Sequence, residues 1–166
     1  MAKVDFITVD TLKANSIISE NVDEKLLIPT LRTVQDLYLQ PILGTVMYED
    51  FKTKITAASL SLTEKALIVD YMHDIITYYV LMLSGVPMKY KYMNKGVMVK
   101  SGADSVSADT ADLKVVKDHW RSIAEGYGNI LTKHLAQNTA TYTLYLSTSL
   151  TGVSAETASY QTGWVL

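Results

Sequence analysis

The sequence contains no cysteine. This absence excludes disulfide bonds, thiolate metal sites and thiol nucleophiles together, and it leaves the redox compartment of the protein open. A large net charge is also absent, since the formal value at pH 7 is −2, and this argues against a protein whose whole surface binds nucleic acid. With 166 residues, 48% hydrophobic and 19% charged, the chain is expected to form one domain with a proper core.

Two stretches lack charge of one or both signs. No acidic residue occurs from Ile75 to Ala103, and Glu156 is the only charged side chain after Asn138. The N-terminal residues show no long apolar run behind a basic start, so we expect no secretion signal. The protein is therefore expected to work in a cytoplasm, or in a particle assembled there.

Recognisable catalytic motifs are missing as well. The sequence has no glycine-rich phosphate loop in a strand–turn–helix context and no G-x-S-x-G elbow. A metal site could be drawn from Asp70, His73 and Asp74, which share a helix face, but a polar face of an amphipathic helix is the interpretation we favour. His119 is expected at the surface. We predict no catalytic, cofactor-binding or metal-binding residue, and no enzyme.

Apolar residues at three- and four-residue steps predict a mainly α fold, an antiparallel helix bundle. The second expected helix, capped by Asn21, contains Pro29, which predicts a kink or a break. Gly126 and Gly128 predict a bend or a close helix contact in the last one. The expected helices are 9–14, 22–39, 45–56, 62–83 and about 110–137.

The chain is expected to be organised around the helix 62–83. Ser61 and Glu64 form a capping box at its start, and the segment 84–87 (Ser-Gly-Val-Pro) predicts its end. From Ile75 to Leu83 the helix is apolar almost all round, a run too short to span a membrane. We expect it to pair with the apolar stripe from Leu113 to Leu135, which includes Val116 and Ile130, and to leave some apolar surface for another subunit.

Residues of about 88–100 alternate lysines with tyrosines and β-formers, which predicts a short strand or hairpin inserted in the helical domain. Lysines can neutralise phosphates and tyrosines can stack, so contact with DNA in a channel or with a subunit is one interpretation. The other, which we favour, has the tyrosines packed on the helices and the lysines in water. The candidate residues are Lys89, Lys91, Asn94, Lys95, Gly96 and Lys100.

Residues 138–166 are expected to form a separate, extended C-terminal arm beside the helical domain 1–137. The part 139–148 is strand-prone, and the end is rich in apolar side chains. The arm could fold back on its own helices or dock on a neighbouring subunit, and its lack of charge favours the neighbour. The candidate docking residues are Tyr160, Thr162, Gly163, Trp164, Val165 and Leu166.

Several short motifs, taken in order, resemble a known family. They are Phe6-Ile7-Thr8-x-x-Thr11-Leu12-Lys13, Asn21-Val22-Asp23-x-Lys25-Leu26-Leu27-x-Pro29, Val34-Gln35-Asp36-Leu37-Tyr38-Leu39-x-Pro41-x-Leu43-Gly44, Asn94-Lys95-Gly96-Val97 and Tyr160-x-Thr162-Gly163-x-x-Leu166. Together they resemble the head-to-tail connector or ring proteins of crAss-like and related tailed bacteriophages. The likeness covers most of the chain but does not extend through 142–157.

The resemblance implies a connector-like helical adaptor without cofactor, a virion protein assembled in the bacterial cytoplasm. Its subunits would form a closed homo-oligomeric ring, expected to be twelvefold, that binds the portal protein and further tail or ring proteins. The ring would line the channel for genomic DNA, and no membrane partner is expected. Alternatives are a tail-completion or stopper protein and a small nucleic-acid-binding module. A metal-dependent enzyme at His73 is a further alternative.

Overall fold

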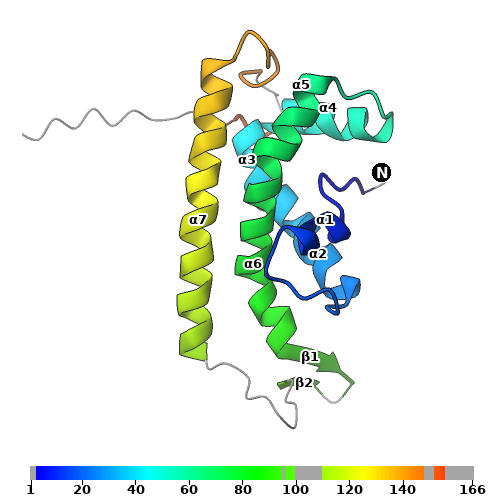
Figure 1. Ribbon diagram of the computed structural model, residues 1–166, viewed down its shortest axis with the longest axis vertical. Coiled ribbons are helices and arrows are strands. Elements are labelled where there is room, and N and C mark those ends of the chain that lie inside the picture. Colours follow the sequence, from blue (N-terminus) through cyan, green and yellow to red (C-terminus); the bar gives the residue numbers. More distant parts are fainter. Residues whose placement is uncertain (1–2, 95, 100–109, 148–151, 156–166) are drawn as a thin grey trace, which may run out of the picture.

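The computed structural model describes residues 3–94, 96–99, 110–147 and 152–155. The fold is mainly helical, as predicted, and Figure 1 shows its arrangement. The elements are α1 (Val9–Ala14), α2 (Glu24–Val34), η1 (Gln35–Leu39), α3 (Gln40–Leu43), α4 (Thr45–Thr56), α5 (Leu62–Leu67), η2 (Ile68–Met72), α6 (His73–Lys89), β1 (Tyr90–Met93), β2 (Gly96–Val99) and α7 (Thr110–Gln137).

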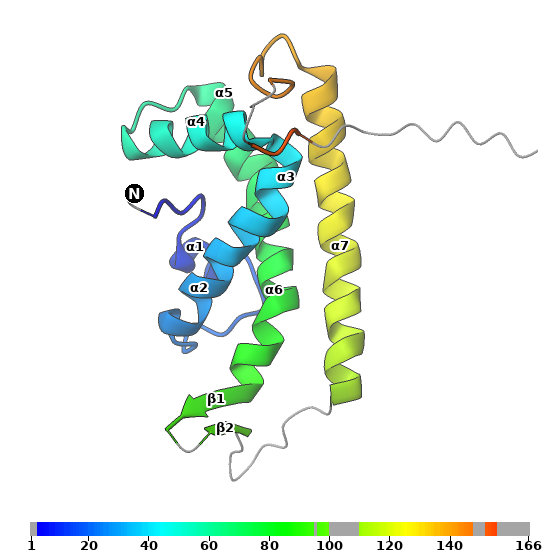
Figure 2. The same ribbon diagram turned by 180° about the vertical axis from the view of Figure 1, so that it is seen from behind.

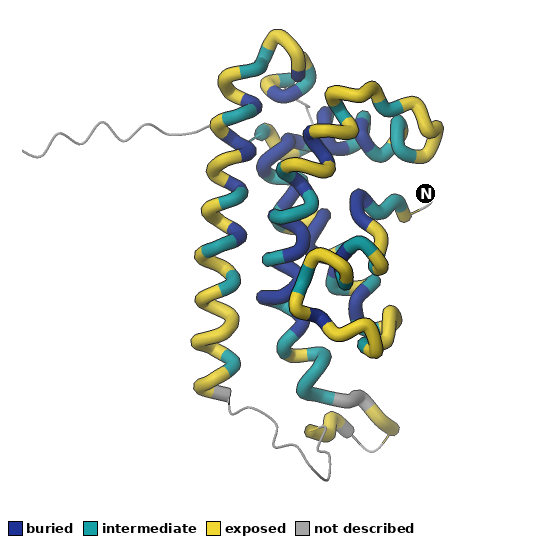
Figure 3. Tube along the Cα trace, viewed as in Figure 1, coloured by how far each residue is buried: buried dark blue, intermediate teal, exposed yellow. Residues whose placement is uncertain are grey.

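Helix α6 lies at the centre of the molecule. Helix α7 packs along one side of it, and α2 packs on another side, in both views of the ribbon (Figures 1 and 2). In Figure 1 the chain runs downward through α6 and upward through α7. The buried residues concentrate along α6 and on the sides of its neighbours that face it (Figure 3).

The central helix begins as predicted and ends later than predicted. The Ser61–Glu64 capping box is present, but the helix continues through Gly85 and Pro87 to Lys89. A proline removes only one hydrogen bond when the preceding turn can tolerate its ring. Here α6 packs on α7, and Gly85 faces Leu113, since an added Cβ at Gly85 would lie 3.6 Å from the Leu113 side chain. Tertiary contact therefore outweighs the local stop signal.

Two wide, π-helical turns interrupt the helices, and no sequence pattern indicated them. In each, a backbone N–H bonds to the carbonyl five residues earlier: Gln40 to Gln35 in η1, and His73 to Ile68 in η2. The turn η1 precedes Pro41, whose ring would clash with the carbonyl four residues before it. Val69, which lies in η2, is exposed.

The segment Leu62–Lys89, taken as one helix of 28 residues, is longer than the apolar run predicted. It is long and apolar enough to cross a membrane by length and composition. The core helix of a folded domain can satisfy the same criteria, and 56% of its most apolar window is buried within this chain. We therefore describe it as the core helix of the domain.

Most of the apolar surface of α6 is covered by its own chain. Tyr79 stacks on Tyr38 of η1 with ring centroids 4.1 Å apart, and Tyr78 stacks on Trp120 and Tyr127 of α7. Leu81 and Met82 are buried as well. η1 and α7 therefore enclose most of this apolar surface, and contact of the remainder with another subunit stays a prediction.

Two further local predictions are corrected. Helix α2 is capped by Asp23 rather than Asn21, because the Asp23 carboxylate accepts from the N–H of Lys25. The helix passes through Pro29 to Val34 without a break.

In α7, Gly128 lies against Ile42 of α3, where an added Cβ would be 3.3 Å from the Ile42 side chain, so the predicted close contact is confirmed there.

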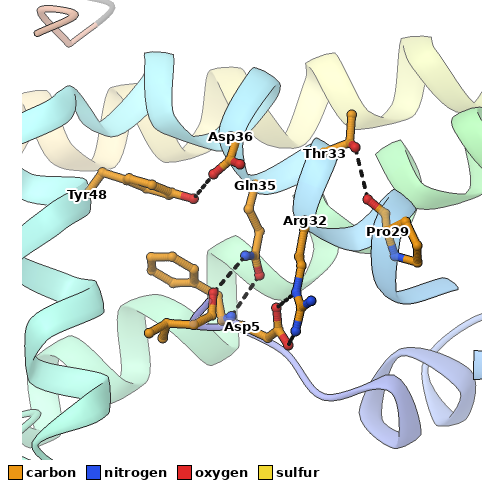
Figure 4. A network of polar contacts seen from close by, with 9 residues as sticks. Asp5, Pro29, Arg32, Thr33, Gln35, Asp36 and Tyr48 are labelled. Carbon is orange, nitrogen blue, oxygen red and sulfur yellow. Dashed lines mark hydrogen bonds and ion pairs between the residues drawn. The ribbon is translucent and has the colours of Figure 1, made fainter. Parts of the chain in front are cut away.

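A buried amide holds the N-terminal segment on the helices (Figure 4). Gln35 accepts a hydrogen bond from the N–H of Phe6 at 2.8 Å through Oε1, and its Nε2 donates to the carbonyl of Val4 at 3.1 Å. Beside it, Arg32 donates from Nε and Nη2 to the two carboxylate oxygens of Asp5. The segment thus makes strand-like bonds to a side chain instead of to another strand.

Replacing Gln35 with leucine should lower the free energy of unfolding by about 1–3 kcal/mol, because the buried N–H of Phe6 loses its acceptor. Urea unfolding measures the change. The exposed Gln137→Leu is the control and should shift stability by less than about 0.5 kcal/mol. Equal effects of the two substitutions would contradict the structural role of Gln35.

The tail after α7 does not begin an extended arm. Residues 138–146 form consecutive turns instead of the predicted strand, and Tyr142 and Tyr145 enter the core. Their rings offer more buried apolar area inside the domain than a strand at its edge could bury. The preference for a neighbouring subunit is therefore wrong for this part of the tail, and the helical domain does not end at residue 137.

A second part of the tail, residues 152–155, docks where α3 meets α4. Thr45 donates from its N–H to the carbonyl of Val153, and Val153 donates from its N–H to Thr45 Oγ1, both at 2.8 Å. Gly44, with φ 74°, leaves room for the backbone of Ala155, and Gly152 lies against Thr45. We call these contacts the tail clamp. The candidate docking residues 160–166 lie outside the described residues.

Candidate interaction surface

The structure fully describes two of the six candidate residues in the lysine-rich segment 88–100. Lys89 ends α6 and is half-buried, with Nζ 5.7 Å from the centroid of the Tyr90 ring. Asn94 is exposed in the turn of the hairpin. The two positions are five residues apart along an extended strand, roughly 16 Å, so they do not form one cluster. Lys91 and Gly96 lie on the strands without described side chains, and Lys95 and Lys100 lie outside the described residues.

The predicted hairpin is confirmed. Strand β1 continues directly from α6 and pairs antiparallel with β2, with Tyr90 opposite Val99 and Met93 opposite Gly96. A two-stranded hairpin without a further layer packed on it is marginally stable by itself. Figure 1 shows it at the lower end of the molecule, beyond the helices that form the core.

The hairpin exposes apolar side chains on both of its faces. Successive residues of a strand point to opposite faces, yet Val97, Met98 and Val99 are each between 52% and 58% exposed. Met93 on β1 is exposed to a similar extent. We call these four residues the hairpin surface. Val97 and Val99 share one face and Met93 and Met98 the other, and clusters of exposed apolar side chains often mark a contact with another molecule.

A groove lies beside the hairpin, between the end of α6 and the start of α7. Its volume is about 350 Å³. Apolar side chains and the Tyr90 ring form most of it, and Lys114 and Lys117 are the charged residues in it. Its lining residues are Leu81, Met82, Gly85, Val86, Tyr90, Leu113, Lys114, Val116 and Lys117. We call it the α6–α7 groove.

The groove explains why part of the predicted apolar stripe on α7 is not buried. Val116 was expected to pack on the central helix, but it is 48% exposed. Figure 1 shows that α6 gives way to the hairpin near the first turns of α7, and Val116 lines the groove beside the last turns of α6. The sequence signal for the groove was present as Val86 and Val116, but periodicity alone cannot distinguish a core position from an exposed apolar one.

Asp70, His73 and Asp74 do not form a metal site in the structure. Asp70 is exposed, whereas His73 is half-buried and turns to the N-terminal segment. Among the described residues, no group of three or more His, Asp or Glu side chains is placed to hold a metal ion. Burial lowers the pKa of His73, although a hydrogen bond with the backbone of Phe6 and the charge of Asp74 act in the opposite direction. Burial also raises the pKa of Asp74.

This environment of His73 predicts how stability depends on pH. The unfolded chain binds a proton at the ordinary pKa of 6.5 and the folded chain only at lower pH, so stability should fall as the pH drops from 6.5 through the folded-state pKa. The slope is at most about 1.4 kcal/mol per pH unit for one proton.

His73→Gln should flatten this slope in urea unfolding curves recorded around pH 6.5, whereas His119→Gln on the exposed side of α7 should preserve it. The raised pKa of Asp74 acts in the opposite direction at lower pH, so the comparison is made near 6.5. A slope that survives in His73→Gln would contradict the burial argument.

The family that matches the sequence carries no functional description. It is described as a family of unknown function (DUF6712), and the match covers residues 39–153. The matched region contains the α6–α7 groove, the hairpin and the Thr45–Val153 contact of the tail clamp, and it ends at Val153, before Ala155. No curated protein and no solved structure matches the chain.

Proposed function

This chain belongs to the DUF6712 family, a family of unknown function, and we propose that it is a structural subunit of an oligomeric ring. From the resemblance in its sequence motifs we infer that this ring would belong to the head-to-tail interface of a tailed bacteriophage, beneath the portal. In this proposal the protein acts by holding neighbouring chains in place, and no reaction is assigned to it.

The observation that carries the proposal is the exposed apolar end of the molecule. The hairpin surface adjoins the α6–α7 groove through Tyr90, which lines the groove and pairs with Val99. Val86 and Val116 extend the apolar area onto the two helices. Other side chains already fill the core of this domain. Burial of the exposed apolar surface against another chain would remove that surface from water and stabilise the association.

A ring imposes a further condition that this chain can meet. Its interfaces are heterologous, so a patch on one subunit must contact a different patch on the next. The hairpin and the groove lie at one end of α6, and the tail clamp lies near the other (Figures 1 and 2). The two ends thus present different surfaces, which supports a head-to-tail arrangement.

The alternatives, a stopper protein and a tail-completion protein, would use the same surface and would differ from a ring in copy number and symmetry. A stopper or tail-completion protein is therefore separated from an adaptor ring by the number of subunits in the assembly. A nucleic-acid-binding module gains no support from Lys89, which lies over Tyr90 and apart from Asn94.

The proposal predicts that Val97→Asp combined with Met98→Lys abolishes assembly without unfolding the chain. The two side chains are about half exposed, so the cost to the folded monomer should stay below about 0.5 kcal/mol each. Mass photometry and negative-stain electron microscopy, with and without portal protein, report the oligomeric state. Circular dichroism reports the helical fold.

Ile130→Lys is the matched control. Ile130 is exposed to a similar extent on α7, and lies about 21 Å from Val116 along the helix, so its substitution should leave the ring intact. A wild-type chain that remains monomeric at every concentration, alone and with portal protein, would rule the proposed function out.

A further inference from the structure

The α6–α7 groove combines apolar walls with positive charge that has no counterpart. Its walls are aliphatic side chains and the Tyr90 ring, and the described residues that line it include Lys114 and Lys117 but no acidic side chain. Both lysines are exposed, and neither forms an ion pair within the part of the chain that the structure describes. An apolar side chain flanked by carboxylates matches this lining, because the apolar part leaves water while the carboxylates form charge-assisted hydrogen bonds.

The connection between α1 and α2 has the complementary chemistry. Ile17 is 74% exposed, and Glu20, Asp23 and Glu24 follow it with no lysine or arginine before Lys25. The three acidic residues are exposed, and among the described residues none of them forms an ion pair. We call Ile17 and these three acidic residues the acidic loop.

Local bonds hold the acidic loop in place on its own domain. Ser16 Oγ accepts from the N–H of Ile18 at 3.2 Å, and Lys13 donates from Nζ to the carbonyl of Glu20 at 2.9 Å. Ile18 is 7% exposed and belongs to the core, whereas the preceding Ile17 stays in water. A loop that is fixed before binding loses less conformational entropy on association than a free segment does.

The groove and the acidic loop belong to different sides of the molecule. Helix α7 lies on one side of α6, and α1 and α2 lie on the other side in both ribbon views (Figures 1 and 2). The loop is bonded to its own domain away from α7, so the groove that it can enter is that of another copy. Repetition of this contact gives each subunit a loop toward one neighbour and a groove toward the other, as a ring requires.

We propose that the α6–α7 groove of one copy binds the acidic loop of a neighbouring copy, with Ile17 in the groove and the loop carboxylates paired with Lys114 and Lys117. The proposal rests on the ring-subunit function and names the contact between its subunits. Charge selects this pairing, because a groove that meets a groove, or a loop that meets a loop, brings like charges together.

Reversal of charge tests the pairing in the full-length protein. Glu20→Lys with Glu24→Lys makes the loop basic like the groove, and Lys114→Glu with Lys117→Glu makes the groove acidic like the loop. Each reversed chain alone should lose assembly in mass photometry, because every contact then joins like charges. An equimolar mixture of the two should assemble again with alternating chains, because each acidic surface then meets a basic one.

Lys65→Glu with Lys133→Glu is the matched control for the groove reversal. It changes the net charge by the same amount, and both lysines are exposed. Lys65 lies on α5, and Lys133 lies roughly 24 Å along α7 from Lys117. This variant should assemble as the wild type does. Circular dichroism reports whether each variant keeps the helical fold.

The absence of cysteine allows a direct test of the contact, since engineered thiols have no background. Ile17→Cys and Val116→Cys chains, each carrying one substitution, are mixed and oxidised. We expect an interchain disulfide dimer that contains one chain of each kind, identified by mass spectrometry. The control pair, Ile17→Cys with Ile130→Cys, should give no such dimer, because Ile130 lies on α7 outside the groove.

The outcomes separate this inference from the proposed function. Reversed chains that each assemble as the wild type does, or a mixture of folded reversed chains that stays monomeric, would overturn the pairing and leave the ring function standing. A groove-reversed chain that forms rings but no longer binds portal protein would overturn the choice of a second copy and identify the portal as the occupant. A wild-type chain that is monomeric at every concentration, alone and with portal protein, would contradict both proposals.

Discussion

Replacing Tyr145 with alanine is expected to lower the free energy of unfolding by about 3–5 kcal/mol, the range for removing a large buried side chain. Tyr145 lies in the turns after α7, is 0% exposed, and is among the largest fully buried side chains of the domain. At about 2–4 °C per kcal/mol for a chain of this size, the melting temperature should fall by about 6–20 °C. Urea unfolding and thermal denaturation measure both quantities.

The adjacent residue supplies a matched control. Leu146 is 58% exposed, so Leu146→Ala should change the free energy of unfolding by no more than about 0.5 kcal/mol. Similar losses in the two variants would mean that the turns after residue 137 do not belong to the core. The experiment therefore decides whether the tail folds back on its own domain up to residue 147.

The second large effect is expected at Gly44. This residue has φ 74° and ψ 154°, a combination that is essentially restricted to glycine and costs other residues about 1–3 kcal/mol. An added Cβ would also lie 2.8 Å from the backbone nitrogen of Ala155, so the tail would have to move. Gly44→Ala should therefore lower the free energy of unfolding by at least the conformational cost and release residues 152–155.

Gly126→Ala is the control for this substitution. Gly126 lies in α7, and an added Cβ meets nothing within 4 Å, so alanine should stabilise the helix by about 0.5–1 kcal/mol. The two variants add the same methyl group with opposite expected signs. Hydrogen exchange of the Thr45 and Val153 amides reports the release of the tail, and unchanged protection of these amides in Gly44→Ala would contradict the clamp.

The local signals in the sequence predicted most of the helices, the hairpin and several of their ends, but not the two π-helical turns. Thr8 accepts from the N–H of Thr11 at the start of α1, and the Ser61–Glu64 box starts α5. The hairpin followed from its β-formers. These features depend on groups within a few residues of one another, so the local sequence contains the information that specifies them.

The candidate site was only partly predictable. The stretch around residues 88–100 was singled out for its lysines, whereas the structure presents its valines and methionines as the exposed feature. The α6–α7 groove joins residues 81–90 to residues 113–117, which are separated by segments that no local pattern connects. The position of the groove depends on where α6 ends beside α7. The sequence signals predicted this end too early, because α6 packs on α7 near Leu113 and continues past Gly85.

The sequence alone determined that the protein is mainly helical, that its longest apolar helix forms the core, and that a short hairpin interrupts the helices. Periodicity, caps and β-propensity act over one or two turns, and they are sufficient for these features. Only the tertiary structure decided which apolar residues stay exposed and where the tail goes. Those outcomes depend on contacts such as Thr45 with Val153, 108 residues apart, and on the competition among distant apolar segments for one core.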